Sequence, residues 1–120
     1  MSAPLRITER SVGDVVFLHL EGHLVFDEGD RILRDRITAL VDAGSLSLLV
    51  DLHDVTYIDS GGIGALVEMY IHVQRRGGRL VLLRPSHVAD RVLHITHLSS
   101  TFQIFEDESV AMRSFSAPVM

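Results

Sequence analysis

The residues with the clearest potential for chemistry stand together between Ile58 and Leu66, in the stretch IDSGGIGAL. Apolar residues keep helical spacing from Ile63 onward, so Ser60 stands at the predicted start of a helix. The first turn of a helix leaves backbone N–H groups unpaired and carries a partial positive charge. Ser60 is therefore expected either to cap this helix or to present its hydroxyl there.

The two glycines directly after Ser60 favour more than a capping role. Each glycine in a helix costs about 1 kcal/mol relative to alanine, and one cap recovers about that much only once. Gly61 and Gly62 lack side chains, so the backbone of another molecule or a phosphate can come close. An open serine hydroxyl at the positive end of a helix is well placed to receive a phosphate. The alternative role, packing of the helix against a sheet, is expected for Gly64 rather than for Gly61 and Gly62.

Two other chemistries that use a residue after a strand do not fit this sequence. A hydrolase nucleophile elbow needs glycine two positions before the serine, where Ile58 stands, and no histidine lies in an obvious general-base context. A phosphoaspartate receiver would use Asp51, near the end of the run LLVDL, together with a pair of acids after the first strand. The first strands end instead in EGH (21–23), and the fourth ends in LRP (83–85) without a lysine. Asp51 is therefore expected to be a loop carboxylate that accepts backbone donors.

The sequence offers no complete metal or nucleotide site. His94 and His97 are three positions apart and would share a helix face, but two ligands without a carboxylate in register do not make a zinc site. The glycines near Ser60 lack the lysine of a P-loop and the spacing of a dinucleotide fingerprint. Cysteine is absent, which removes thiol catalysis and cysteine–zinc sites. We therefore predict no catalytic residues, no metal and no other cofactor.

Composition limits the classes of partner. The net charge of −5 and the absence of tryptophan argue against a nucleic-acid surface. The basic cluster from Arg75 to Arg79 is interpreted as a cationic helix end with a glycine stop. No apolar segment reaches membrane-spanning length, and the first residues lack the apolar run of a signal peptide. The lack of cysteine fits a reducing compartment, so we predict a cytoplasmic protein. From the charge and the apolar pattern, we predict that it binds neither nucleic acid nor membrane.

The elements that must position these residues follow from the hydrophobic pattern. Apolar runs predict strands over Leu5–Arg10, Val15–Leu20, Leu48–Leu52, Leu80–Leu83 and Phe102–Phe105. Helices are predicted to begin near Asp27, at Ser60, after Pro85 and at Asp107. In the two short helices, the side chains expected to face inward are Val88, Val92 and Ile95, and then Val110, Ala111 and Phe115.

These elements predict an α/β fold in one domain over residues 1–120, with the tail 116–120 frayed. A leading hairpin that turns at residues 11–14, followed by crossover units, implies a mixed, mostly parallel sheet of about five strands with four helices packed against it. Ser60 then follows the carboxyl end of the third strand, which is where open α/β sheets bind ligands.

From Val50 to Leu66 the chain reads VDLHDVTYIDSGGIGAL, which resembles the signature of STAS domains, specifically the bacterial anti-sigma factor antagonists. The resemblance covers most of the chain, including Gly22 and Leu24 after the second strand, the helix end at 76–78 and the segment 92–105. It implies that Ser60 is phosphorylated by an anti-sigma factor, itself a serine kinase, and dephosphorylated by a serine phosphatase. It also implies that the unphosphorylated form binds the kinase and frees the sigma factor, and that the domain is not an enzyme.

The chain departs from the family pattern at two places. Gly61 stands where serine or alanine is usual, which keeps the site small but makes the turn more flexible. Val25 and Phe26 stand where a polar residue is common, near the partner-facing loop. Phe26 either packs the first helix onto the core or, if exposed, serves as a hydrophobic anchor. Asp59 is expected to orient the site or bind the partner rather than to act as a base. The residues expected to bind the partner are Asp59, Gly61, Gly62, His23, Val25 and Phe26.

A second class of function stays open at the level of the sequence. It is a STAS-type scaffolding module, or one that senses a nucleotide or another ligand, without a phosphorylation switch. In that class Ser60 is silent and the loop binds a nucleotide or another protein. Incubation with ATP and a cognate serine kinase separates the two classes.

Overall fold

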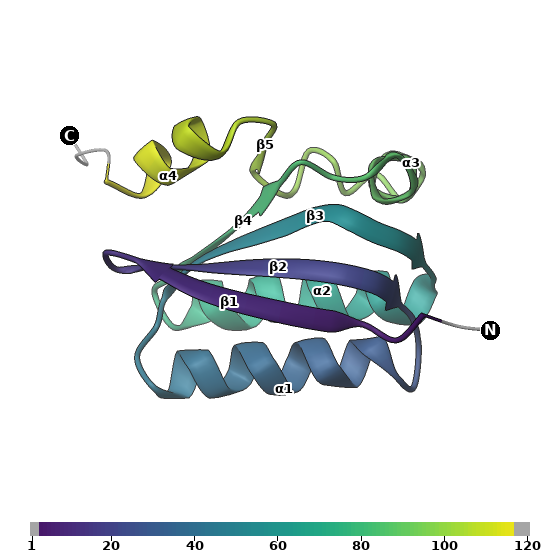
Figure 1. Cartoon of the computed structure of the whole chain (residues 1–120), viewed down its shortest axis with the longest axis horizontal. Helices are drawn as coiled ribbons and strands as arrows, with labels where there is room; N and C mark the ends of the chain where they lie inside the picture. Colours follow the sequence, from purple (N-terminus) through teal and green to yellow (C-terminus); the bar gives the residue numbers. More distant parts are fainter. Residues whose placement is uncertain (1–2, 117–120) are drawn as a thin grey trace.

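The computed structural model describes residues 3–116, in which helices and strands alternate after a leading hairpin (Figure 1). The strands are β1 (Arg6–Val12), β2 (Val15–Leu24), β3 (Ser47–Ile58), β4 (Arg79–Leu83) and β5 (Ile104–Phe105). The helices are α1 (Gly29–Asp42), α2 (Ser60–Arg75), α3 (His87–Ile95) and α4 (Glu108–Ser116). The strands form one sheet in the order β1-β2-β3-β4-β5, in which β1 is antiparallel to β2 and the other neighbours are parallel. The predicted α/β fold with a mixed, mostly parallel sheet is confirmed.

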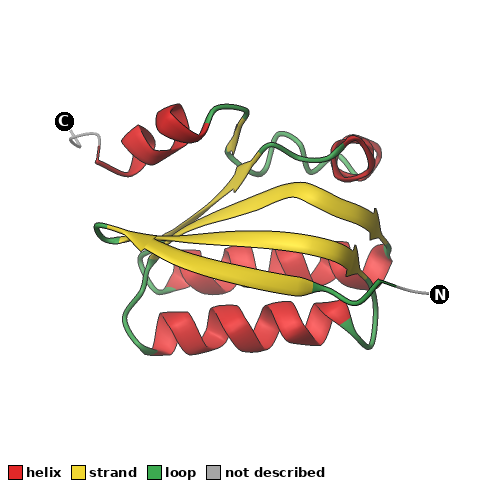
Figure 2. Ribbon diagram, in the orientation of Figure 1, coloured by secondary structure: helices red, strands yellow, loops and turns green. Residues whose placement is uncertain are grey.

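Successive apolar side chains of the central strands point to opposite faces of the sheet, and both faces are buried. On one face, residues such as Leu48 and Val50 form the larger core with α1 and α2, which lie side by side under the sheet in Figure 2. On the other face, Leu49 and Val81 form a smaller cluster with Ala111 of α4. Since the central strands are covered on both faces, they carry continuous apolar runs rather than a strict alternation.

β3 is much longer than the predicted strand Leu48–Leu52. It continues through residues 53–57, most of which are exposed, and ends at Ile58. These exposed residues interrupt the apolar run in the sequence, but pairing with β2 continues to the pair Leu24–Ile58 across two register shifts. Ser60 consequently lies just beyond the carboxyl end of β3, as predicted.

The hairpin between β1 and β2 is tighter than the predicted turn over residues 11–14. Val12 still belongs to β1 and pairs with Val15. Gly13 and Asp14 alone turn the chain, and Gly13 has a left-handed φ of 61°. A two-residue hairpin requires such a conformation, which glycine adopts without steric cost.

The two short helices bury side chains that differ in part from those predicted. In α3, Ala89 and Leu93 are buried, whereas Ile95 in the last turn is 69% exposed. In α4, Ala111 is buried as predicted, but Val110 is exposed. In helices of nine residues, several apolar faces fit the same sequence, so packing against the sheet decides which one is buried.

The ends of the last elements also differ from the prediction. The last strand contains only Ile104–Phe105, while Phe102 is buried in the larger core without belonging to a strand. Ser116, predicted to lie in a frayed tail, is the final residue of α4, and residues 117–120 of that tail lie outside the described residues. Between residues 3 and 116, none of the helices has the length and apolar character needed to cross a membrane.

Candidate functional site

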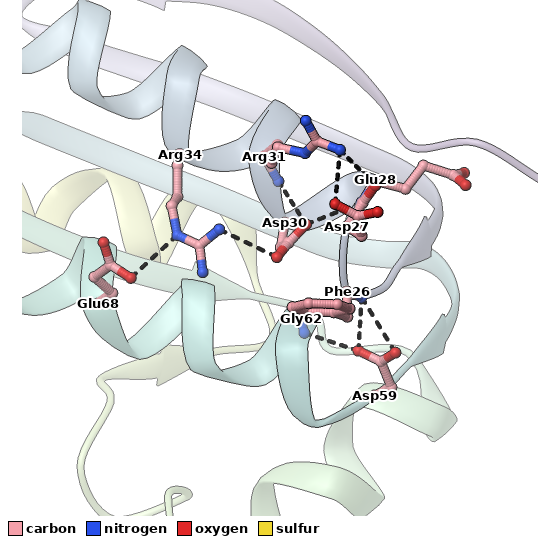
Figure 3. A network of polar contacts seen from close by, with 9 residues as sticks. All are labelled: Phe26, Asp27, Glu28, Asp30, Arg31, Arg34, Asp59, Gly62 and Glu68. Carbon is pink, nitrogen blue, oxygen red and sulfur yellow. Dashed lines mark hydrogen bonds and ion pairs between the residues drawn. The ribbon is translucent and has the colours of Figure 1, made fainter.

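Asp59, rather than Ser60, caps helix α2. Its Oδ1 atom accepts a hydrogen bond from the Gly62 N–H at 2.9 Å. The same carboxylate accepts the Phe26 N–H, at 3.0 Å from Oδ1 and 3.2 Å from Oδ2, as Figure 3 shows. Asp59 therefore ties the loop after β2 to the first turn of α2, and the expectation that Ser60 could be the cap is wrong.

Ser60 is left open by this arrangement. It is the first residue of α2 and is exposed. Its hydroxyl makes no hydrogen bond with any residue among 3–116. Because the start of a helix carries a partial positive charge, it favours negative charge at this position, such as that of a phosphate.

Gly61 and Gly62 allow α2 to press against the end of β2 and the loop that follows it. A Cβ atom on Gly62 would lie 1.9 Å from the carbonyl oxygen of Leu24, and one on Gly61 would lie 2.4 Å from the Phe26 Cβ. A Cβ on Gly64 would meet nothing within 4 Å. The predicted division of roles is therefore reversed, because Gly61 and Gly62 serve close packing and Gly64 does not.

Phe26 is 70% exposed, so the interpretation that it packs α1 onto the core is wrong. Its ring atom Cδ1 lies 3.0 Å from the Cβ position of Gly61, so the side chain rests beside the first turn of α2. Val25 is half-buried, and its carbonyl accepts the Asp30 N–H at 3.0 Å. An exposed phenylalanine held beside Ser60 by a backbone hydrogen bond is a suitable anchor for a protein partner.

His23 lies at the same end of the sheet, near the end of β2. It is half-buried, and its Nδ1 lies 3.3 Å from the Ala3 N–H, which donates to it. Its ring centroid is 5.7 Å from that of Tyr57, whose side chain is largely exposed. Tyr57 was not among the predicted site residues, although its position two residues before Asp59 in an extended segment was a signal for an outward-facing ring.

An ion network joins the first turns of α1 to α2 (Figure 3). Arg34 bridges Asp30 and Glu68, with both N–O distances at 3.1 Å. Burial by itself raises the pKa of Asp30, but hydrogen bonds from Arg34 and from the N–H groups of Glu28 and Arg31 outweigh it and hold that pKa below its ordinary value. This network ties the beginning of α1 to the middle of α2, about two turns beyond Ser60.

Asp51 is a buried strand residue and not the loop carboxylate that the sequence suggested. It accepts the His53 N–H at 3.0 Å, as expected for a carboxylate that takes backbone donors. It also accepts hydrogen bonds from Arg84 at 2.8 Å and from His19 at 3.0 Å. Burial alone raises the pKa of Asp51, but these hydrogen bonds outweigh it and keep the pKa below its ordinary value. This carboxylate is paired inside the sheet, in β3, and does not belong to the Ser60 site.

The two histidines considered as metal ligands do not share a helix face. His94 lies in α3, whereas His97 lies beyond the end of that helix with a left-handed φ of 60°. Within residues 3–116, no three histidine, aspartate or glutamate side chains are grouped closely enough to hold a metal ion.

The order of strands and helices, with an Asp-Ser pair at the start of α2, matches a known family. The family model described as STAS domain matches residues 6–111. The chain belongs to the STAS domain family. The resemblance carried by residues 50–66 is thereby confirmed at the level of the family.

Similar proteins of this STAS family carry related names. The anti-sigma-B factor antagonist of Bacillus subtilis is 34% identical over 73 residues, which are 61% of this chain and 66% of that protein. A Thermotoga neapolitana protein, provisionally named as an anti-sigma factor antagonist, is 29% identical over 109 residues, which are 91% of this chain and 93% of that protein. The anti-sigma factor antagonist SpoIIAA in its unphosphorylated form has the same fold, with a TM-score of 0.79 and 20% identity over 96% of this chain and 100% of that one. Its phosphorylated form, from Bacillus, has a TM-score of 0.72 and 20% identity over 92% and 99% of the two chains.

Proposed function

We propose that this STAS domain is an anti-sigma factor antagonist that is switched by phosphorylation of Ser60. In its unphosphorylated form it binds an anti-sigma factor with serine kinase activity and thereby releases a sigma factor. A serine phosphatase restores that form. One observation at the start of α2 carries the proposal. Asp59 caps the helix, and the exposed Ser60 hydroxyl has no hydrogen-bond partner among residues 3–116.

The chemistry of transfer belongs to the kinase. The terminal phosphoryl group of ATP moves to Oγ of Ser60, the bond to ADP breaks, and a base of the kinase takes the hydroxyl proton. Asp59 is unsuited to be that base, because its carboxylate already accepts two backbone N–H groups. It instead positions the serine by fixing the first turn of α2. The STAS domain is a substrate and a binding module and has no catalytic step of its own.

The names of the relatives support the choice of partner. The Bacillus subtilis relative is named as an antagonist of an anti-sigma factor, and the fold of SpoIIAA has been described in unphosphorylated and phosphorylated forms. The site in this chain offers a matching surface, since the exposed Phe26 lies against Gly61, the residue that follows the serine. A large aromatic anchor next to a modifiable hydroxyl fits a protein partner better than a small ligand.

The test uses purified anti-sigma serine kinases from the source organism. Each kinase is incubated with the chain and ATP, and the modified residue is mapped by mass spectrometry. The proposal predicts one phosphate on Ser60 with at least one kinase, and none on the Ser60→Ala variant, which still binds that kinase. Nucleotide binding without transfer would instead favour the ligand-sensing module, and transfer to another residue would contradict the assignment of Ser60.

A further inference from the structure

Gly64 occupies an exposed position in the second turn of α2, where the fold makes no use of a glycine. A Cβ atom there would meet no heavy atom within 4 Å, in contrast to Gly61 and Gly62. Its φ is not left-handed, since it lies within the regular helix. A helix interior with glycine is less stable than one with alanine. Neither packing nor backbone conformation therefore explains why this position lacks a side chain.

The position of Gly64 relative to Ser60 suggests the reason. Residues four apart are neighbours on a helix surface, so Gly64 lies one turn beyond Ser60 on the same face. The Cα–Cβ bonds of a helix tilt toward its N-terminus, and a helical side chain covers the turn before its own Cα. Any side chain at position 64 would thus lean over the turn that presents the Ser60 hydroxyl.

The remaining neighbours leave this approach open. Phe26 lies on the Gly61 side of the turn, where it contacts the Cβ position of that glycine. Glu68, one turn beyond Gly64, is drawn toward α1 by its 3.1 Å ion pair with Arg34. The bare surface next to Ser60 is therefore the backbone at Gly64.

We propose that Gly64 is a specificity-determining residue of the Ser60 site, kept without a side chain so that the serine kinase can close over the helix and reach the hydroxyl. This inference rests on the proposed function. It adds that Gly64, one helical turn beyond Ser60, controls the access of the kinase to the hydroxyl. The fold itself does not require glycine at that position.

The experiment compares Gly64→Ala and Gly64→Gln with the parent chain, using the kinase that phosphorylates the parent. Gln74→Ala, an exposed substitution in the last turn of α2, is the matched control. Both Gly64 variants are expected to melt at a higher temperature than the parent, because alanine and glutamine are better helix formers. The kcat/KM for phosphorylation of Ser60 is expected to fall about tenfold for alanine and about a hundredfold for glutamine. Gln74→Ala is expected to keep the parental rate.

Each result decides the matter. A folded Gly64→Gln variant that is phosphorylated at the parental rate would overturn the inference while leaving the proposed function intact. A lower melting temperature for Gly64→Ala would also overturn it, since the glycine would then serve the fold. If no kinase phosphorylates Ser60 in the parent, the proposed function fails and this inference fails with it.

Discussion

At the scale of single residues, Asp59 is the most informative position. From the sequence, Ser60 was a candidate for the cap because serine is a preferred N-cap residue, and a free hydroxyl was the alternative. Asp59 is equally suited to that role, and which of two adjacent residues begins the helix is decided by tertiary contacts, here the hydrogen bond from the Phe26 N–H. Because the N-cap is Asp59 and not Ser60, the serine hydroxyl has no structural role at the helix start and is available for modification.

A pair of substitutions tests this assignment. Asp59→Ala removes the cap and the acceptor of the Phe26 N–H, so it should lower the free energy of unfolding by about 1–2 kcal/mol. Ser60→Ala should change it by less than about 0.5 kcal/mol, because the hydroxyl is exposed and makes no hydrogen bond within residues 3–116. Urea unfolding followed by circular dichroism measures both. The opposite ranking would mean that Ser60 is the cap in solution.

At the scale of elements, the contact between α2 and the end of β2 controls the site. The first turn of α2 approaches so closely that the Leu24 carbonyl occupies the space a side chain at position 62 would need. Because the obstructing atom belongs to the backbone of a strand, it cannot move aside easily. The same closeness brings Phe26 beside Ser60.

Gly62→Ala should consequently destabilise the domain by about 3 kcal/mol or more. Gly64→Ala, in open space two residues further on, is the matched comparison and should stabilise it by about 0.5–1 kcal/mol. Thermal and urea unfolding of the two variants give the difference directly. Equal effects of the two substitutions would show that α2 does not pack against β2 as closely as described.

The elements themselves could largely be predicted from the sequence, because buried strands and amphipathic helices carry periodic apolar patterns. The second half of β3 could not, since residues 53–57 are mostly exposed and their strand character depends on pairing with β2. The glycines after Ser60 pointed to the candidate site, but the predicted division of their roles was wrong. That division depends on which glycine faces Leu24, a long-range contact that no local pattern encodes.

At the scale of the whole molecule, a buried charge cluster stabilises the middle of the sheet. Asp51 in β3 is 1% exposed, and its partners Arg84 and His19 come from other parts of the chain. An unpaired carboxylate in that position would be costly, so the cluster links the stability of the sheet to pH. It lies apart from the Ser60 site and is not expected to take part in partner binding.

The depressed pKa of Asp51 gives the direction of that dependence. A carboxyl whose pKa is lower in the folded than in the unfolded state adds stability above its unfolded pKa of about 3.9, and this contribution is lost as the pH falls through the folded pKa. Asp51→Asn should lower the free energy of unfolding by about 1–3 kcal/mol at pH 7, discounted because Arg84 and His19 are partly exposed. The difference between parent and variant should shrink below about pH 3.9. A difference that stays constant from pH 7 to pH 3 would contradict the pairing.

In the proposed function, the residue that is switched lies apart from the residues that stabilise the fold. Ser60 lies on the surface at one end of the sheet, so a phosphate there adds about −1.5 to −2 charges without entering the core. The start of α2 should tolerate that charge, with a gain of a few tenths to about 1 kcal/mol from the helix dipole. In a complex, the same phosphate would be desolvated beside the Asp59 carboxylate, which costs several kcal/mol.

The most direct test of the account is the affinity of the phosphorylated chain for the proposed anti-sigma kinase, measured by calorimetry together with the melting temperature of the free chain. We predict that phosphorylation of Ser60 weakens binding by about a hundredfold or more and leaves the melting temperature nearly unchanged. Ser60→Asp should also leave the melting temperature nearly unchanged and should weaken binding by a smaller factor, since one carboxylate carries less charge than a phosphate. Equal affinities for the phosphorylated and unphosphorylated chains, or a loss of affinity that merely follows unfolding, would contradict the account.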